Sequence, residues 1–153
     1  MEETLRQTIE VEKKERKRGG LSALLFLDID GFGDINAKLG PTSGDELLIS
    51  TGKMLKNSLR GGDTVYRFGG DEFAIIFKGI SMAEARLAAE RIQRTINQHK
   101  FSIEYEKYNM YLSMGIIQID GTIDMVTLLS KALNALYKAK KLGKNQIVVY
   151  QEE

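Results

Sequence analysis

A nearly continuous apolar run, LSALLFLDI at residues 21–29, constrains the fold of this chain more than any other segment. Its length and the glycines that flank it favour a buried β-strand over a helix. The end of the run carries Asp28 and Asp30, which the two-residue period of a strand places on one face. The sequence therefore predicts a buried strand that presents two carboxylates at its end.

Two shorter β-type runs, residues 64–68 and 72–77, predict a hairpin. Gly69-Gly70-Asp71 lies between them and supplies the turn residues that such a connection requires. The two glycines let the backbone turn tightly and allow a bulky ligand to approach the main chain. Asp71 and Glu72 then stand side by side at the tip of the hairpin.

Carboxylates on these two elements indicate a cation site. If the strand at 21–29 lies beside the hairpin, the acidic side chains of both elements converge. Crowded carboxylates repel one another unless a cation binds or water screens them. Mg²⁺ prefers hard oxygen ligands, commonly one or two carboxylates together with substrate phosphates. A Gly-Gly-Asp-Glu turn taken alone is weak support, because most such turns are only turns.

Helical and β patterns alternate along the rest of the chain. Residues 42–59 are typical of a helix that Thr42 or Ser43 caps, with Glu46 completing a capping box. Antiparallel pairing at the hairpin and its neighbours predicts an α+β fold, with one mostly antiparallel central sheet wrapped by helices. The other expected elements are helices at 2–18, 81–98 and 124–141, two or three strands within 101–119 and a last strand at 146–150.

The first of these helices is highly charged, and its apolar residues are sparse: Leu5, Ile9 and Val11. In one interpretation it packs a narrow stripe on the fold and ends at Gly19-Gly20. In the other, equally open, it is a solvated linker helix of a larger chain. We therefore expect an N-terminal charged helix or linker at residues 1–20 and the main domain at residues 21–153.

Composition excludes several kinds of chemistry. A chain of 153 residues is the size of one domain. With no cysteine and one histidine, it lacks a disulfide scaffold, a thiolate zinc site and a multi-histidine metal site, and a Ser/His/Asp hydrolase is disfavoured. The formal net charge of +1 argues against a nucleic-acid partner bound by bulk charge. No apolar run reaches the ~18 residues of a membrane span, and no signal-peptide pattern is present, so we expect a cytoplasmic location.

Lysines accumulate near the C-terminus, where no acidic residue lies between Met125 and Gln151. One interpretation is a solvated helix face, favoured by the dipole at a helix C-terminus. The other, next to a carboxylate–Mg²⁺ site, is a clamp on a polyphosphate. The residues concerned are Lys131, Lys138, Lys140, Lys141 and Lys144.

Four separated motifs resemble the GGDEF domain family in order and spacing, from about Leu21 to Tyr150. They are FLDIDxFxxIN at residues 26–36, Gly44-Asp45, RFGGDEF at 67–73 and YKAKxxGxN at 137–145. The enzymes of this family are diguanylate cyclases, which condense two GTP into cyclic di-GMP and release two pyrophosphates. Their fold is similar to nucleotidyl cyclase and polymerase palm domains, which agrees with the α+β pattern predicted above.

The resemblance implies roles for individual residues. Asp28 and Asp71 would bind two Mg²⁺, or Mn²⁺, with the Ile29 carbonyl as a further ligand. Asp71 and Glu72 are the implied catalytic residues, and Glu72 would act at the metal or help to deprotonate the attacking 3′-hydroxyl. The implied substrate-binding residues are Phe32, Asn36, Asp45, Gly69, Gly70, Lys140 and Lys144.

Within that set, Asn36 and Asp45 would read the base. Guanine offers N1–H and N2–H₂ donors that an Asp carboxylate accepts, whereas adenine has an acceptor at N1. Lys140 would contact the triphosphate. Arg60 and Asp63 resemble the Arg-x-x-Asp product-inhibition site of the family, in which an Arg fork and an Asp hold cyclic di-GMP; the alternative is a surface ion pair or turn.

The chain departs from the family pattern at several positions. The usual opening motif, of the Asp-x-Leu-Thr-Gly-Leu-x-Asn-Arg type, is absent, either because the sequence was cut inside the domain or because the protein lacks it. Gly33 stands where many members carry a phosphate-contacting Lys, and Lys144 replaces a common Arg, which loses a bidentate fork but keeps the charge. No metal ligand is lost, and we expect weaker GTP binding.

Three functions follow from these observations. The first is an active, Mg²⁺-dependent and product-inhibited diguanylate cyclase, which needs a second copy of the domain because each site holds one GTP. The second is a catalytically silent module that binds GTP or cyclic di-GMP as a sensor. The third, and weakest, is a different nucleotidyl cyclase of the same fold, against which Asp45 argues.

Overall fold

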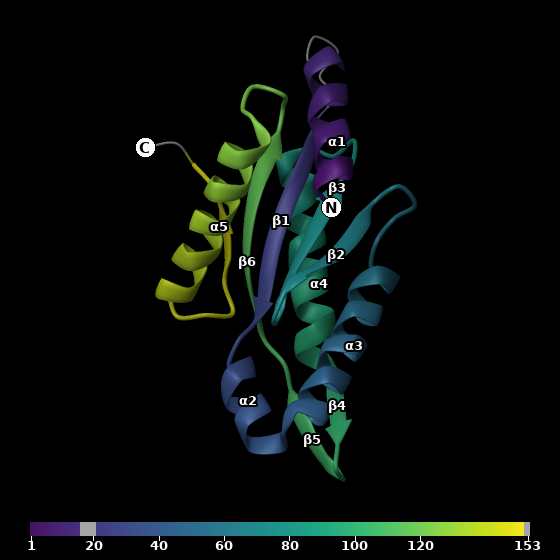
Figure 1. The fold of residues 1–153 in the computed structure, drawn as a ribbon, viewed down its shortest axis with the longest axis vertical. Coiled ribbons are helices and arrows are strands. Elements are labelled where there is room, and N and C mark those ends of the chain that lie inside the picture. The colour runs from purple at the N-terminus through teal and green to yellow at the C-terminus, as the bar shows by residue number, and fades with distance from the viewer. Residues whose placement is uncertain (16–20, 152–153) are drawn as a thin grey trace.

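The computed structural model describes residues 1–15 and 21–151, and Figure 1 shows the arrangement of their helices and strands. The helices are α1 (Glu2–Glu15), α2 (Phe32–Leu39), α3 (Pro41–Asn57), α4 (Met82–Gln98) and α5 (Met125–Lys141). The strands are β1 (Ser22–Ile29), β2 (Thr64–Gly69), β3 (Glu72–Phe77), β4 (Lys100–Ile103), β5 (Glu106–Asn109), β6 (Leu112–Ile119) and β7 (Ile147–Val149).

Strand β1 forms the centre of a five-stranded sheet with the order β2-β3-β1-β6-β7. It pairs antiparallel with β3 on one side and with β6 on the other. β2 and β3 form the predicted hairpin, whereas β7 lies parallel to β6. The prediction of an α+β fold with a mostly antiparallel sheet is therefore confirmed. β4 and β5 form a separate two-stranded sheet.

Side chains of β1 alternate between two hydrophobic cores, because successive strand residues point to opposite faces. Leu25 and Leu27 pack in the core that includes α3 and α4, and Leu24 and Phe26 pack in the core that includes α1 and α5. Figure 1 shows α5 on one side of the sheet and α3 and α4 on the other. By this alternation Asp28 faces α5.

Helix α5 lies very close to β6 at Gly115. A Cβ atom on this glycine would be 2.4 Å from the backbone nitrogen of Leu136 and 2.7 Å from the carbonyl oxygen of Ala132. The missing side chain thus lets the helix backbone approach the strand. The contact helps to hold the C-terminal end of α5, with Lys140, beside the end of β1.

Helix α1 packs on the sheet through a narrow apolar stripe. Leu5 is fully buried and Ile9 is nearly so, whereas Val11 is 48% exposed. This supports the packed-helix interpretation, although Val11 takes no part in the stripe. The expected helix end at Gly19-Gly20 lies outside the described residues.

Two polar contacts also join α1 to the sheet. The hydroxyl of Tyr66 on β2 donates a hydrogen bond to Thr4 Oγ1 at 2.8 Å. The hydroxyl of Ser22, at the start of β1, donates to Glu12 Oε1 at 2.7 Å. Helix α1 therefore contacts the first residue of β1, the strand that carries Asp28 near its other end.

Helix α3 begins one residue earlier than predicted, at Pro41. Its N-cap is Gly40, with φ 88° and no side-chain hydrogen bond, so the expected cap at Thr42 or Ser43 and the capping box with Glu46 are wrong. Proline suits this position because its fixed φ is helical and the first turn needs no N–H donor.

None of the described helices is long and apolar enough to span a membrane.

Candidate functional site

The end of β1 and the tip of the β2–β3 hairpin come together, as the sequence predicts. Asp28 lies opposite Glu72 in the antiparallel pairing of β1 with β3. A cavity of about 260 Å³ opens beside this pair. Its lining comes from the end of β1, the start of α2, the hairpin tip and the C-terminal end of α5. The lining residues are Asp28, Ile29, Asp30, Gly31, Phe32, Gly33, Asp34, Asp71, Lys140 and Lys144.

Asp28 is the buried carboxylate of this cavity, with 3% of the residue exposed. Its Oδ2 forms an ion pair with Lys140, and its Oδ1 has no hydrogen-bond partner among the described residues. Burial raises the pKa of Asp28, Lys140 opposes that rise, and the charges of Asp71 and Asp30 add to it. A second cation beside Oδ1 would therefore be strongly favoured.

Lys140 reaches the cavity from the last turn of α5. Partial burial lowers the pKa of Lys140, but the hydrogen bond and charge of Asp28 outweigh this effect, and Asp71 and Glu72 add to it, so that the pKa is raised. The ammonium also lies 5.6 Å from the centre of the Tyr137 ring. Lys140 thus remains charged and faces carboxylates from both β1 and the hairpin.

The hairpin tip has the tight geometry that its glycines predict. Gly70 has φ 49°, in the left-handed region that glycine adopts readily. Arg67 Nε donates a hydrogen bond to the Gly70 carbonyl oxygen at 3.1 Å, and the pairing register shifts between Arg67 and Gly69. Asp71 lines the cavity, whereas Gly69, Gly70 and Glu72 do not.

The predicted base-reading residues lie at the junction of α2 and α3. Asn36 on α2 packs against Gly44 on α3: a Cβ at Gly44 would be 2.1 Å from Asn36 Oδ1 and 3.3 Å from the Phe32 ring. Asp45 follows Gly44 and is exposed. Of these residues only Phe32 lines the cavity, so the junction forms a flank of the site.

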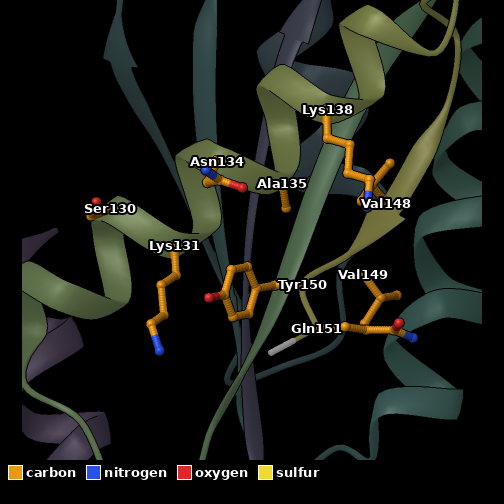
Figure 2. A pocket seen from close by; sticks show the side chains of 9 residues that line it. All are labelled: Ser130, Lys131, Asn134, Ala135, Lys138, Val148, Val149, Tyr150 and Gln151. Carbon is orange, nitrogen blue, oxygen red and sulfur yellow. The ribbon is translucent and has the colours of Figure 1, made fainter. Parts of the chain in front are cut away.

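Four of the five C-terminal lysines line one of two pockets, and Lys141 lines neither of them. Lys140 and Lys144 line the carboxylate cavity. Lys131 and Lys138 instead line a groove of about 410 Å³ between α5 and β7 (Figure 2). Figure 2 shows Lys131 beside Tyr150, and its ammonium lies 5.2 Å from the centre of that ring. Of the four lysines that line these two pockets, only Lys140 and Lys144 could therefore clamp a polyphosphate at the carboxylate cavity.

Arg60 and Asp63 face each other across a turn before β2. Arg60 Nε lies 3.1 Å from Asp63 Oδ2, and Asp63 Oδ1 also accepts a hydrogen bond from the Lys78 backbone N–H at 3.2 Å. The Asp63 side chain is 2% exposed and the Arg60 side chain is 48% exposed. The hydrogen bond that the Arg60 side chain donates to Asp63 raises the pKa of Arg60. Arg60 thus presents a guanidinium to solvent.

The residues at the cavity fit a divalent cation whose remaining ligands come from a substrate. Among the described residues, no three acidic or histidine side chains are grouped as a complete metal site. Asp28 supplies a buried oxygen without a partner, and Asp71 lines the same cavity. Two carboxylates with phosphate oxygens are a common ligand set for Mg²⁺.

Two features of the site go beyond the sequence predictions. Helix α2, which positions Phe32 and Asn36, has the apolar spacing Phe32, Ile35 and Leu39, but it is only eight residues long.

The sequence pattern groups Asp30 with Asp28 as a converging carboxylate. In the structure Asp30 accepts hydrogen bonds from the Ser113 hydroxyl at 2.6 Å and from the Asn145 backbone N–H at 2.8 Å.

Comparison with known protein families identifies a match over most of the chain. The family model described as "Diguanylate cyclase, GGDEF domain" matches residues 1–146. Diguanylate cyclase DgcS of Shewanella oneidensis is 34% identical over 135 residues, which cover 88% of this chain and 44% of that protein. The chain spans less than half the length of the curated relatives it matches first.

Solved structures show the same fold. The isolated GGDEF domain of YfiN (TpbB) from Pseudomonas aeruginosa superposes with a TM-score of 0.89 at 28% identity, covering 98% of this chain and 87% of that one. The GGDEF domain of DgcB from Caulobacter crescentus, solved in complex with c-di-GMP, gives a TM-score of 0.88 at 21% identity, covering 97% and 86%.

Proposed function

The chain belongs to the GGDEF diguanylate cyclase family, and we propose that it condenses two GTP molecules into cyclic di-GMP with release of two pyrophosphates. The observation that carries this proposal is the cavity in which Asp28, Asp71, Lys140 and Lys144 meet. Paired carboxylates for a cation, with lysines for phosphate oxygens, are what phosphoryl transfer from a nucleoside triphosphate requires. We assign this chemistry to residues 21–153 and propose that residues 1–20 are an N-terminal segment, helix or linker, that precedes this domain.

Asp28 and Asp71 would hold the cation, with the Ile29 carbonyl as a further ligand. Mg²⁺ is the expected ion, two per site, and Mn²⁺ offers the same chemistry. When bound, the metal neutralises charge that develops on the transferring phosphate. The unpartnered Oδ1 of Asp28 supports this assignment, because a buried carboxylate oxygen without a donor is costly.

Glu72 would accept the proton of the attacking 3′-hydroxyl or act at the metal. It stands opposite Asp28 in the sheet, so its carboxylate is held by the strand pairing rather than by a mobile loop. Gly69 and Gly70 leave the hairpin tip without side chains where the substrate would approach.

Lys140 and Lys144 would bind the triphosphate. Lys140 already pairs with Asp28, and we propose that it exchanges this partner for a phosphate oxygen when the cation arrives. Asp28 would then pair with the cation and Lys140 with the phosphate, so that neither charge is left unpaired.

Asn36 and Asp45 would read guanine at the flank of the site, with Phe32 against the nucleotide. A carboxylate at Asp45 accepts from guanine N1–H and N2–H₂ but meets an acceptor at N1 of adenine. The exposure of Asp45 leaves it available to a base.

Catalysis would need a second copy of the domain. Each new phosphodiester joins the 3′-oxygen of one GTP to the α-phosphate of another, and the Gly-Gly-Asp-Glu motif occurs once in the chain. Two copies that face each other would each present one substrate. Arg60 and Asp63 would bind the product and slow the reaction, and the exposed Arg60 guanidinium supports this role.

The test is incubation with GTP and Mg²⁺, with the product identified by mass spectrometry. We expect cyclic di-GMP and pyrophosphate from the unaltered protein. Asp28→Asn and Asp71→Asn should each lower turnover by about two orders of magnitude or more, without unfolding the domain. Asp34→Asn, which removes a charge from the same cavity at a residue without an assigned role, should keep most of the activity.

A second candidate is a catalytically silent module that binds GTP or cyclic di-GMP. Gly33 favours it, since this wall of the cavity carries no side chain to contact phosphate. The same experiment separates the two functions: a silent module would bind nucleotide and yield no product. A third candidate, a cyclase acting on another nucleotide, would convert ATP in parallel assays.

A further inference from the structure

The two aspartates at the end of β1 have different surroundings, although they are two residues apart. Asp28 keeps one oxygen that has no hydrogen-bond partner within residues 1–15 and 21–151. Both oxygens of Asp30 are occupied, since Oδ1 accepts from the Ser113 hydroxyl at 2.6 Å and Oδ2 accepts from the Asn145 backbone N–H at 2.8 Å. Asp30 therefore has no free oxygen to offer a cation in this arrangement.

The bonds of Asp30 join three separate parts of the chain. Ser113 is on β6, the neighbour of β1, and is fully buried. Asn145 lies in the loop between α5 and β7, 115 residues away from Asp30 along the chain. That loop also contains Lys144, a residue that lines the carboxylate cavity.

The loop has a backbone shape that residues with side chains adopt reluctantly. Gly143 has φ 117°, Lys144 has φ 64° and Asn145 has φ 50°. Consecutive left-handed residues persist only when neighbouring groups hold them. Asp30 holds the loop from one side, and Gln93 of α4 holds it from the other, with Nε2 3.0 Å from the Asn145 carbonyl oxygen and 3.2 Å from its Oδ1.

We propose that Asp30 is a positioning residue that fixes the Gly143–Asn145 loop so that Lys144 faces the triphosphate. This inference rests on the proposed function, because it assigns the cavity to a nucleoside triphosphate. Asp30 does not touch the substrate; it acts through Lys144. A fixed loop matters because the Lys144 side chain is flexible and carries its charge at one point. It lacks the rigid fork of donors that an arginine would have.

The conservative substitution distinguishes positioning from charge. In Asp30→Asn the amide oxygen accepts from Asn145 N–H and the amide nitrogen donates to the Ser113 hydroxyl, so both links survive without the negative charge. In Asp30→Ala both links are lost. If Asp30 positions the loop, Asp30→Asn should retain the nucleotide affinity that Asp30→Ala loses. If Asp30 were a metal ligand, both variants should lose it.

The first readout is affinity for a GTP analogue in which a methylene replaces the α–β bridging oxygen, measured by calorimetry with Mg²⁺. We expect Asp30→Ala to weaken binding by about tenfold, the scale of one charge-assisted contact, and Asp30→Asn to restore most of it. Lys144→Ala should weaken binding similarly, and adding Asp30→Ala to it should cost little more. Full additivity of the two substitutions, or an equal loss in Asp30→Asn, overturns the proposal.

The second readout is hydrogen exchange at the Asn145 amide, which needs no nucleotide. We expect faster exchange in Asp30→Ala and protection in Asp30→Asn, with the core strands unchanged; unchanged exchange in Asp30→Ala overturns the proposal. If the unaltered protein does not bind the analogue, the proposed function fails, and the exchange experiment still decides whether Asp30 holds the loop. If Asp30→Ala does not fold, Gln93→Ala releases the loop from the α4 side and takes its place in both measurements.

Discussion

Gly115 illustrates how a single residue sets the position of α5, the helix that carries Lys140. A Cβ there would meet backbone atoms of α5, which cannot rotate away as a side chain can. We predict that Gly115→Ala lowers the free energy of unfolding by about 1–3 kcal/mol, as overpacking typically does. Urea denaturation measures this change through the midpoint at unchanged slope.

Gly33→Ala is the matched control for that substitution. A Cβ at Gly33 would meet nothing within 4 Å. Alanine favours a helix over glycine by up to about 1 kcal/mol, so stability should be unchanged or slightly higher. A loss of stability in Gly33→Ala equal to that in Gly115→Ala would contradict the packing explanation.

Asp45 should decide which base is accepted. In Asp45→Ala the guanine N1–H and N2–H₂ donors lose their acceptor, so we predict that GTP affinity falls by about tenfold or more while ATP affinity hardly changes. Competition binding with both nucleotides measures the ratio. Glu46→Ala, which removes the neighbouring exposed carboxylate, is the control and should leave the ratio intact. Equal binding of ATP and GTP by the unaltered protein would refute the assignment.

At the residue level, the sequence located the carboxylates correctly but could not distinguish their partners. Strand periodicity predicts that Asp28 and Asp30 share one face, and in the structure both line the same cavity, although β1 ends at Ile29. Their partners come from α5, from β6 and from the α5–β7 loop, all more than 80 residues away, and local patterns carry no information about such contacts. The ion pair of Asp28 with Lys140 and the hydrogen bonds of Asp30 are therefore properties of the folded molecule.

Among the elements, α5 has Asp124 as the N-cap of its first turn. Two hydrogen bonds from Thr127 lower the pKa of Asp124 below the ordinary 3.8. The bond from the side chain has the larger effect, and the bond from the backbone N–H has the smaller one. A carboxylate whose pKa is lower in the folded state stabilises it above the unfolded-state pKa, and this contribution is lost as the pH falls through the folded-state value.

We therefore predict that the stability advantage of the unaltered protein over Asp124→Ala is constant near neutrality and shrinks below about pH 4. Asp124→Asn can still accept from Thr127 but does not titrate, so its advantage over Asp124→Ala should stay constant over the same range. Denaturation curves at several pH values test both statements. An advantage of the unaltered protein that does not vary with pH would contradict them.

Long periodic segments were the elements that could be predicted from sequence. The helices at 82–98 and 125–141 and the hairpin agree closely with expectation. Helix α2 was missed because its eight residues lie between Gly31 and Gly40, where glycines indicate a loop. The α3 cap was misplaced because Ser43 and Glu46 fit a capping box, while Gly40 and Pro41 start the helix through backbone conformation alone.

For the whole molecule, we predict that turnover requires two copies. The specific activity should rise with protein concentration, most steeply below the dissociation constant of the pair, because one chain carries one Gly-Gly-Asp-Glu motif. Initial rates over a wide range of enzyme concentrations test this. A specific activity independent of concentration would mean that one chain is sufficient.

Product inhibition should depend on Arg60. We predict that Arg60→Ala raises the concentration of cyclic di-GMP needed for half-inhibition by about tenfold or more, because it removes a charge-assisted fork. The rate without product should stay unchanged. Arg86→Ala, which removes the exposed guanidinium that pairs with Glu90 at 3.4 Å, is the control and should leave inhibition as it is. Unchanged inhibition in Arg60→Ala would make the Arg60–Asp63 pair a surface turn.

If turnover requires two copies, the protein also has to avoid aggregation, and the two edges of its five-stranded sheet affect that risk. β7 offers only three residues, Ile147–Val149, to a neighbouring strand. β2, at the other edge, breaks its regular pairing between Arg67 and Gly69. Short or irregular edges give a second sheet few consecutive ladder hydrogen bonds. Such edges should disfavour edge-to-edge association of two sheets at the concentrations at which two copies would pair.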